Sequence, residues 1–216
     1  MVDFDDRTPP YVRYLARLIR PFPNFDFFFM KRMRQRAIKA LQLLPGSRAL
    51  DVGCGPGGSF PYLVKSVGLH GEVVGVEISP EVVINAKRRV EANQWNNVQV
   101  VEGDARTVSL NGKFDGLVLF AAPDVYASPE ALANLLPYLK DNARVAIFGG
   151  KLSHRRSAGA LNLLFRSLMK LSFSSTPRLN YEPWCVLENR LIEMDVREFF
   201  FGCMFLVSGV YKTNRN

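Results

Sequence analysis

The stretch that decides the fold reads Ala49-Leu50-Asp51-Val52-Gly53-Cys54-Gly55-Pro56-Gly57-Gly58. It is a short apolar segment that runs into a glycine-dense turn. Glycine lets the backbone turn sharply and lets a ligand approach main-chain N–H groups without a Cβ in the way. Asp51 stands two residues before the first glycine, and a carboxylate at the end of a buried strand is costly unless a polar or cationic group meets it. The turn therefore predicts a site for a nucleoside-bearing small molecule that carries positive charge.

Strand-like and helix-like segments alternate from residue 47 onward. Strands are predicted over 48–52, 72–77, 98–102, 114–120 and 144–148, and helices over 57–67, 80–93 and 128–139. Repeated strand–helix units predict an α/β fold, a Rossmann-like parallel sheet with helices on both faces. Residues 186–200 and 204–212 are apolar and strand-rich, without a clear helix between them. They predict an antiparallel pair at the sheet edge.

The composition is that of a globular protein, with 48% hydrophobic and 22% charged residues among 216. Cys54, Cys185 and Cys203 show no CxxC spacing, which argues against a disulfide framework or zinc site and for a reducing compartment. The acidic start is not a secretory signal, and the longest apolar stretch, 199–211, is too short for a membrane-spanning helix. We expect a cytoplasmic protein that can still lie on the inner face of a membrane.

The net charge of +8 is concentrated in two segments. Residues 1–40 carry +5 and residues 151–178 carry +6, so the remainder sums to −3. Such basic surfaces attract nucleic acid, anionic lipid or anionic small molecules.

The N-terminal segment differs in character from the rest of the chain. Residues 11–19 place their apolar side chains on one helical face, and residues 25–36 combine phenylalanines with Lys and Arg. Residues 159–170 repeat this theme. Basic helices with aromatics are typical of membrane-surface or lid elements. We expect an amphipathic extension over 1–44 and a catalytic domain over 45–216, although the extension can also cap the core or pack in a dimer.

Further carboxylates follow the next two predicted strands. The Gly53-x-Gly55-x-x-Gly58 spacing is shared with nucleotide dehydrogenases, and Glu77 is placed to accept ribose hydroxyls of either NAD or S-adenosylmethionine (SAM). Asp51 favours SAM, because a dehydrogenase usually has an apolar residue there. Asp104 also favours SAM, since a carboxylate after the third strand can accept an adenine amino hydrogen.

These segments resemble the class I SAM-dependent methyltransferases over about residues 45–150. The resemblance rests on the motifs Leu50-Asp51-Val52-Gly53-Cys54-Gly55-Pro56-Gly57, Gly75-Val76-Glu77-Ile78-Ser79, Glu102-Gly103-Asp104-Ala105 and Phe114-Asp115. It implies a seven-stranded sheet with an antiparallel last strand. One departure is Lys140-Asp141-Asn142-Ala143, where the family usually has a Lys-Pro-Gly-Gly turn.

The resemblance also implies the cofactor, SAM, with S-adenosylhomocysteine as product and no metal. Asp51, Gly53 and Gly55 would face the methionine part, Glu77 the ribose and Asp104 the adenine. The full set of implied cofactor-binding residues is Asp51, Gly53, Cys54, Gly55, Glu77, Ile78, Asp104, Ala105 and Phe120.

The acceptor is expected at the carboxyl ends of the fourth and fifth strands. Tyr126 and His154 are candidate catalytic residues there, against the alternatives of a packing tyrosine and a surface histidine. Arg155 and Arg156 suit a phosphate or carboxylate on the substrate, and Tyr14 is a further candidate substrate contact.

The chain most resembles the small ubiquinone/menaquinone-type and phosphatidylethanolamine-type methyltransferases. We therefore expect methyl transfer to an apolar or amphiphilic acceptor, either a phospholipid amine or a quinone precursor, at an anionic membrane surface. A small soluble acceptor, an RNA methyltransferase and a non-catalytic SAM-binding protein are the alternatives. RNA is less favoured because no RNA-binding module is evident. The sequence leaves the oligomeric state open.

Overall fold

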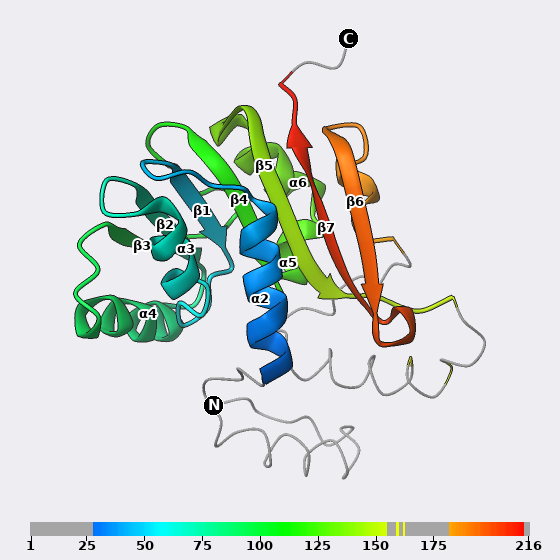
Figure 1. Cartoon of the computed structure of the whole chain (residues 1–216), viewed down its shortest axis with the longest axis horizontal. Helices are drawn as coiled ribbons and strands as arrows, with labels where there is room; N and C mark the ends of the chain where they lie inside the picture. Colours follow the sequence, from blue (N-terminus) through cyan, green and yellow to red (C-terminus); the bar gives the residue numbers. More distant parts are fainter. Residues whose placement is uncertain (1–27, 155–158, 160–161, 163–181, 214–216) are drawn as a thin grey trace.

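A seven-stranded sheet forms the centre of the molecule in the computed structural model (Figure 1). The structure describes residues 28–154, 159, 162 and 182–213. The strand order is β3-β2-β1-β4-β5-β7-β6, and β7 runs antiparallel to both of its neighbours, whereas the other described strands pair in parallel. The predicted α/β fold with an antiparallel last strand is therefore confirmed. The strands are β1 (Arg48–Val52), β2 (Glu72–Glu77), β3 (Val98–Glu102), β4 (Phe114–Phe120), β5 (Leu139–Gly150), β6 (Leu191–Phe199) and β7 (Met204–Tyr211).

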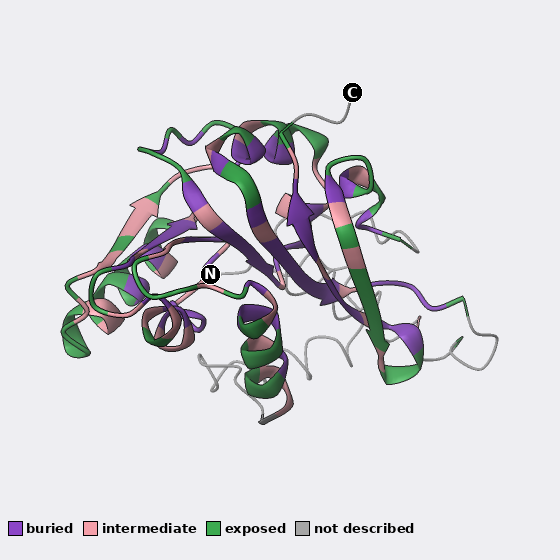
Figure 2. Ribbon diagram, turned by 45° about the horizontal axis from the view of Figure 1, so that its top comes forward, coloured by how far each residue is buried: buried purple, intermediate pink, exposed green. Residues whose placement is uncertain are grey.

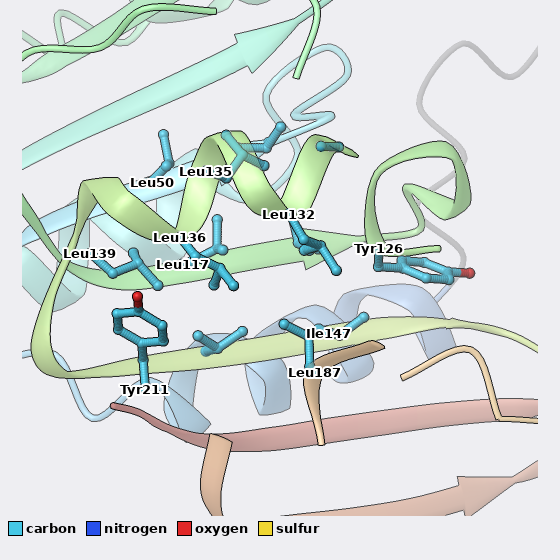
Figure 3. Packing of buried hydrophobic residues seen from close by; sticks show 14 of the residues in the cluster. Leu50, Leu117, Tyr126, Leu132, Leu135, Leu136, Leu139, Ile147, Leu187 and Tyr211 are labelled. Carbon is cyan, nitrogen blue, oxygen red and sulfur yellow. The ribbon is translucent and has the colours of Figure 1, made fainter. Parts of the chain in front are cut away.

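Helices cover both faces of the sheet because successive strand side chains point to opposite faces. Val118 and Phe148 join the apolar cluster beneath α2, α3 and α4. Leu117 and Ile147 join the cluster beneath α6, which Figure 3 shows from close by. The helices are α2 (Phe28–Ala40), α3 (Phe60–Val67), α4 (Pro80–Ala92), α5 (Pro123–Tyr126) and α6 (Pro129–Leu135), with single 3-10 turns at η1 (Leu136–Tyr138), η3 (Cys185–Leu187) and η4 (Phe200–Gly202).

Some element boundaries differ from the sequence prediction. The fifth strand covers Leu139–Gly150 rather than 144–148, because Leu139 pairs with β4 at one end and Gly149 and Gly150 pair with β7 at the other. The helix predicted over 128–139 divides into α6 and η1, and Ser128 caps α6 by accepting a hydrogen bond from the Ala131 N–H at 3.1 Å. The short helix α5 precedes it and was not predicted.

Burial is greatest in the middle of the sheet (Figure 2). The strands β1, β2, β4 and β7 are almost wholly buried, whereas β6 at the edge is exposed along most of its length. Every parallel strand ends at the same edge of the sheet, so the residues after β1, β2, β3 and β4 come together there.

The N-terminal extension is described only from residue 28. Within it, Met33, Ala37 and Ile38 of α2 are buried against the sheet, so this helix contributes to the core. The amphipathic helix predicted over 11–20 and most of 159–170 lie outside the described residues. The division into 1–44 and 45–216 stays a prediction.

Among the described residues, no helix has both the length and the apolar character needed to cross a membrane.

Candidate functional site

The glycine turn after β1 is held against the end of β2. The N–H groups of Gly53 and Cys54 both donate to the Val76 carbonyl oxygen, at 2.8 and 3.1 Å. Gly53 has a φ of +69°, and a Cβ there would lie 2.7 Å from the Cβ of Ala122. Gly55 has a φ of +56°, and a Cβ there would meet nothing within 4 Å. The turn is thus tightly packed on one side and open on the other, which leaves room for a ligand over Gly55.

Asp51 lies beneath this turn and is fully buried. Neither carboxylate oxygen has a hydrogen-bond partner among the described residues. Burial raises the pKa of Asp51 to about 7, and the charge of Glu77 adds to the rise, while the charge of Arg34 and the nearby Ser59 hydroxyl oppose it. A buried carboxyl group in this condition is strongly destabilising unless a ligand supplies a cation or donors.

Glu77 ends β2 with its carboxylate already oriented. Its Oε2 accepts the Gly55 N–H, and its Oε1 accepts those of Ile78 and Ser79, each at 3.0 Å. The Ile78 side chain beside it is apolar yet 60% exposed. Carboxylate oxygens have further lone pairs, so Glu77 can still accept hydrogen bonds from a ligand.

Asp104 follows β3 and is held by Arg106. Both carboxylate oxygens accept hydrogen bonds from the guanidinium, and Oδ1 also accepts the Arg106 backbone N–H at 2.9 Å. These bonds hold the pKa of Asp104 below its usual range, so the group is ionised at neutral pH. Asp51, Glu77 and Asp104 therefore follow or end three adjacent strands, which places three carboxyl groups along one edge.

Two pairs of aromatic side chains lie in the carboxyl-terminal parts of β4 and β5 and between α2 and η4. Phe120 stacks on Phe148 with ring centroids 4.6 Å apart. Phe29 of α2 meets Phe200 of η4 edge-on at 4.4 Å, and Phe201 is 66% exposed. This end of the site is consequently apolar, in contrast to the carboxyl groups beside it.

One residue of the site, Arg34, was missed from the sequence. Arg34 of α2 donates to Ser59 Oγ at 3.1 Å, and its Cζ lies 4.1 Å from the centroid of the Phe120 ring. Arg34 was grouped with the basic run 31–36 as a surface feature. The helical spacing could have predicted that Arg34 faces the sheet, since it lies four residues from both Met30 and Ile38 on the apolar face of α2.

Comparisons with known proteins match this arrangement. Residues 49–142 match the family described as a methyltransferase domain. The chain is 32% identical over 145 residues to the demethylmenaquinone methyltransferase of Staphylococcus saprophyticus, which covers 66% of this chain and 58% of that protein. It is also 32% identical over 126 residues to the demethylmenaquinone methyltransferase of Bacillus cereus, and this alignment covers 56% of this chain and 49% of that protein. A solved SAM-dependent methyltransferase from Aquifex aeolicus has a TM-score of 0.63 at 23% identity, covering 97% and 100% of the two chains.

Together, the family match and the matched relatives support a class I SAM-dependent methyltransferase. The chain spans about half the length of the curated relatives it matches. At 23% identity, the likeness to the Aquifex aeolicus structure concerns the fold.

The remaining predicted site residues of the methyltransferase are placed as follows. Tyr126 is buried in the core with its hydroxyl against the Gly149 backbone, and burial raises the pKa of this phenol above its ordinary value (Figure 3). His154 is exposed. Ala105 is buried in the core cluster beneath α6. Tyr14, Arg155 and Arg156 lie outside the described residues. Because Tyr126 is buried in the core cluster, it occupies the position of a packing residue.

Cys54 is buried within the turn, and burial raises the pKa of its thiol, so it is a small apolar residue there. No group of three or more His, Cys, Asp or Glu side chains that could hold a metal occurs within the part of the chain that the structure describes. The expectation of a metal-free site stays a prediction.

Proposed function

We propose that this protein transfers a methyl group from SAM to an amphiphilic acceptor of the isoprenoid quinol class. The observation that carries the proposal is the fully buried Asp51 carboxyl group, which lies beneath an open glycine turn without a hydrogen-bond partner among the described residues. A cationic ligand end at this position relieves its desolvation cost. The quinol class is supported by the names of two matched relatives, both demethylmenaquinone methyltransferases.

The residues along the strand ends fit SAM. Asp51 would meet the ammonium of the methionine part and Glu77 the two ribose hydroxyls, because ionised carboxylates accept such hydrogen bonds strongly. Asp104 would accept the adenine amino hydrogen, and the exposed Ile78 would pack against the nucleoside. When bound, SAM supplies a methyl group on a sulfonium, which a nucleophile displaces in line. The chain's own contribution is to hold the reacting groups in that geometry.

The aromatic end of the site suits an apolar ring. Phe120 and Phe148 lie at the carboxyl ends of β4 and β5, where the acceptor is expected, and they form a stacked pair. Phe29 and Phe200 extend this aromatic character towards α2 and the β6–β7 connection. Phe120 and Phe148 are buried, so the exposed rings of Phe200 and Phe201 would be the ones to meet the aromatic ring of an isoprenoid quinol.

Methylation at a ring carbon releases one proton from the acceptor. A base with a pKa near 7 would help to remove it. His154 is exposed and Tyr126 is packed in the core, so His154 is the more accessible of the two candidates. Its role as the base stays a proposal.

The test uses the purified protein with SAM labelled in its methyl group. Four acceptors are supplied separately: a demethylated isoprenoid quinol, phosphatidylethanolamine vesicles, RNA and a soluble metabolite extract. We expect label in the quinol and the mass increase of one added methyl group. Glu77→Ala should abolish the transfer, and Glu72→Ala, a carboxylate removed at the opposite end of the same strand, should retain it.

Label in the phospholipid, RNA or soluble fraction instead would refute the quinol assignment and identify the acceptor class. Label in none of the four, with SAM binding intact, would leave a SAM-binding protein without this activity.

A further inference from the structure

Arg34 reaches the cofactor turn from a helix outside the matched methyltransferase segment. It lies on α2, whereas the family match begins at residue 49. A Cβ added to Gly58 would lie 2.8 Å from the Arg34 Cζ, so the guanidinium is in direct contact with the turn. Nη1 donates to the buried Ser59 hydroxyl at 3.1 Å, and the guanidinium carbon lies 4.1 Å from the Phe120 ring centroid. The side chain is thus positioned by two separate parts of the site, the glycine turn at Gly58-Ser59 and the end of β4 at Phe120.

The charge of Arg34 complements that of Asp51. Arg34 donates to Ser59, whose hydroxyl lies near Asp51, and the charge of Arg34 opposes the rise in the pKa of the Asp51 carboxyl group. An anion and a cation beside one glycine turn match a zwitterion, and the amino-acid end of SAM is one, with an ammonium and a carboxylate on the same carbon. Asp51 alone matches only the ammonium.

We infer that Arg34 binds the carboxylate of the amino-acid end of SAM, opposite Asp51, and thereby makes α2 part of the cofactor site. The inference rests on the proposed function, because it takes SAM as the ligand. A guanidinium has five N–H donors in a plane that fits a carboxylate with two parallel hydrogen bonds. Contact with the Phe120 ring restricts the orientation of that plane, which lowers the entropy lost on binding.

Neighbouring basic residues on α2 supply a matched comparison. Lys31 and Arg32 are exposed, and Arg36 is exposed with its guanidinium carbon 5.7 Å from the centroid of the Phe199 ring. If positive charge on this helix strengthened SAM binding in general, removing Lys31 would also weaken the affinity. If Arg34 binds the carboxylate specifically, only the removal of Arg34 would do so.

The experiment measures binding of three ligands by calorimetry. SAM carries both the carboxylate and the ammonium, decarboxylated SAM keeps only the ammonium, and methylthioadenosine lacks both. Arg34→Met, which keeps an apolar stem against Phe120, should weaken SAM binding about tenfold or more, since a charged hydrogen-bond pair is lost. Binding of the other two ligands should change by less than about twofold. Arg34→Lys should restore SAM binding in part, because a single ammonium lacks the paired donors.

Two further variants sharpen the result. Asp51→Asn should weaken SAM and decarboxylated SAM alike and leave methylthioadenosine unchanged. Lys31→Ala should leave all three affinities unchanged, and thermal unfolding confirms that each variant is folded.

An equal loss for all three ligands in Arg34→Met would show that Arg34 only packs the turn, and no loss for any ligand would show that the carboxylate is bound elsewhere. Either result overturns the inference while the wild-type protein still binds SAM. A wild-type protein that binds none of the three overturns the proposed function itself.

Discussion

The two ends of β1 and β2 carry charged side chains in opposite conditions. At the amino ends, Arg48 donates to Glu72 Oε2 at 2.6 Å and to two backbone carbonyl oxygens at 3.0 and 3.1 Å. At the carboxyl ends, Asp51 is buried with no hydrogen-bond partner among the described residues. The Glu77 carboxylate accepts hydrogen bonds from three backbone N–H groups and has further lone pairs for a ligand.

This difference separates a structural end from a binding end. A buried polar group that lacks partners costs free energy, and most of those in folded proteins are satisfied. Arg48 follows that rule, and its guanidinium also lies 4.7 Å from the centroid of the Phe114 ring. Asp51 departs from it three residues further along the same strand. Such departures are expected at functional sites, where a ligand completes the interactions.

The largest expected effect comes from removing a carboxylate at the binding end. Glu77→Ala should weaken SAM binding by about a thousandfold, because two hydrogen bonds from ribose hydroxyls to a charged acceptor contribute about 1.5–3 kcal/mol each. The same change also frees the N–H groups of Gly55, Ile78 and Ser79, which loosens the turn. Calorimetric titration with SAM measures the loss.

Glu72→Ala is the matched change at the structural end. It removes the ion pair with Arg48, so it should lower the free energy of unfolding and leave SAM affinity within about twofold. If Glu72→Ala weakened SAM binding as much as Glu77→Ala, the two ends would not differ in function.

Much of the fold could be predicted because its signals are local. Alternating strand and helix patterns predicted the sheet, because each pattern lies within a few consecutive residues. The full length of β5 was missed, since its first residue pairs with Phe114 of β4 and its last two pair with β7, more than 50 residues away in the sequence. Pairing between distant segments leaves no signal in a local window.

The carboxylates of the site were identified for the same topological reason. Asp51, Glu77 and Asp104 lie at or just after the ends of parallel strands, and such ends share one edge of a sheet. Arg34 was not identified, because its place depends on how α2 packs on the sheet. A basic run in the sequence does not show which of its members faces inward.

A second prediction concerns the cost of the buried Asp51. Its pKa is about 7 in the folded protein, against an ordinary value near 4 in the unfolded chain. Between those values the folded protein holds a proton that the unfolded chain has lost, so stability falls as the pH rises from 4 to 7. Asp51→Asn should remove this loss and raise the unfolding free energy at pH 8, relative to pH 4, by about 4 kcal/mol. Urea unfolding of the ligand-free protein at both pH values measures it.

Asp115→Asn provides the comparison from the structural end. The Asp115 carboxylate accepts the Arg48 backbone N–H at 2.8 Å and pairs with Lys140 at 2.8 Å. Removing this satisfied carboxylate should lower stability at pH 8. A gain in stability for Asp115→Asn, or none for Asp51→Asn, would contradict the contrast between the two ends.

The smallest expected effect concerns the exposed ion pair between Arg106 and Asp104, which follows β3 at the same edge of the sheet. Arg106 is 59% exposed, and an ion pair this open to solvent contributes little. Arg106→Gln should weaken SAM binding at pH 7 by about threefold or less, because the backbone N–H of residue 106 still orients Asp104. Without the guanidinium, the pKa of Asp104 should rise towards its ordinary value, so binding should weaken further at pH 4.5 in the variant than in the wild type. Calorimetry at both pH values measures the two losses. A loss of tenfold or more at pH 7 would show that Arg106 contacts the ligand directly, and the site would then include a cation beside the Asp104 carboxylate.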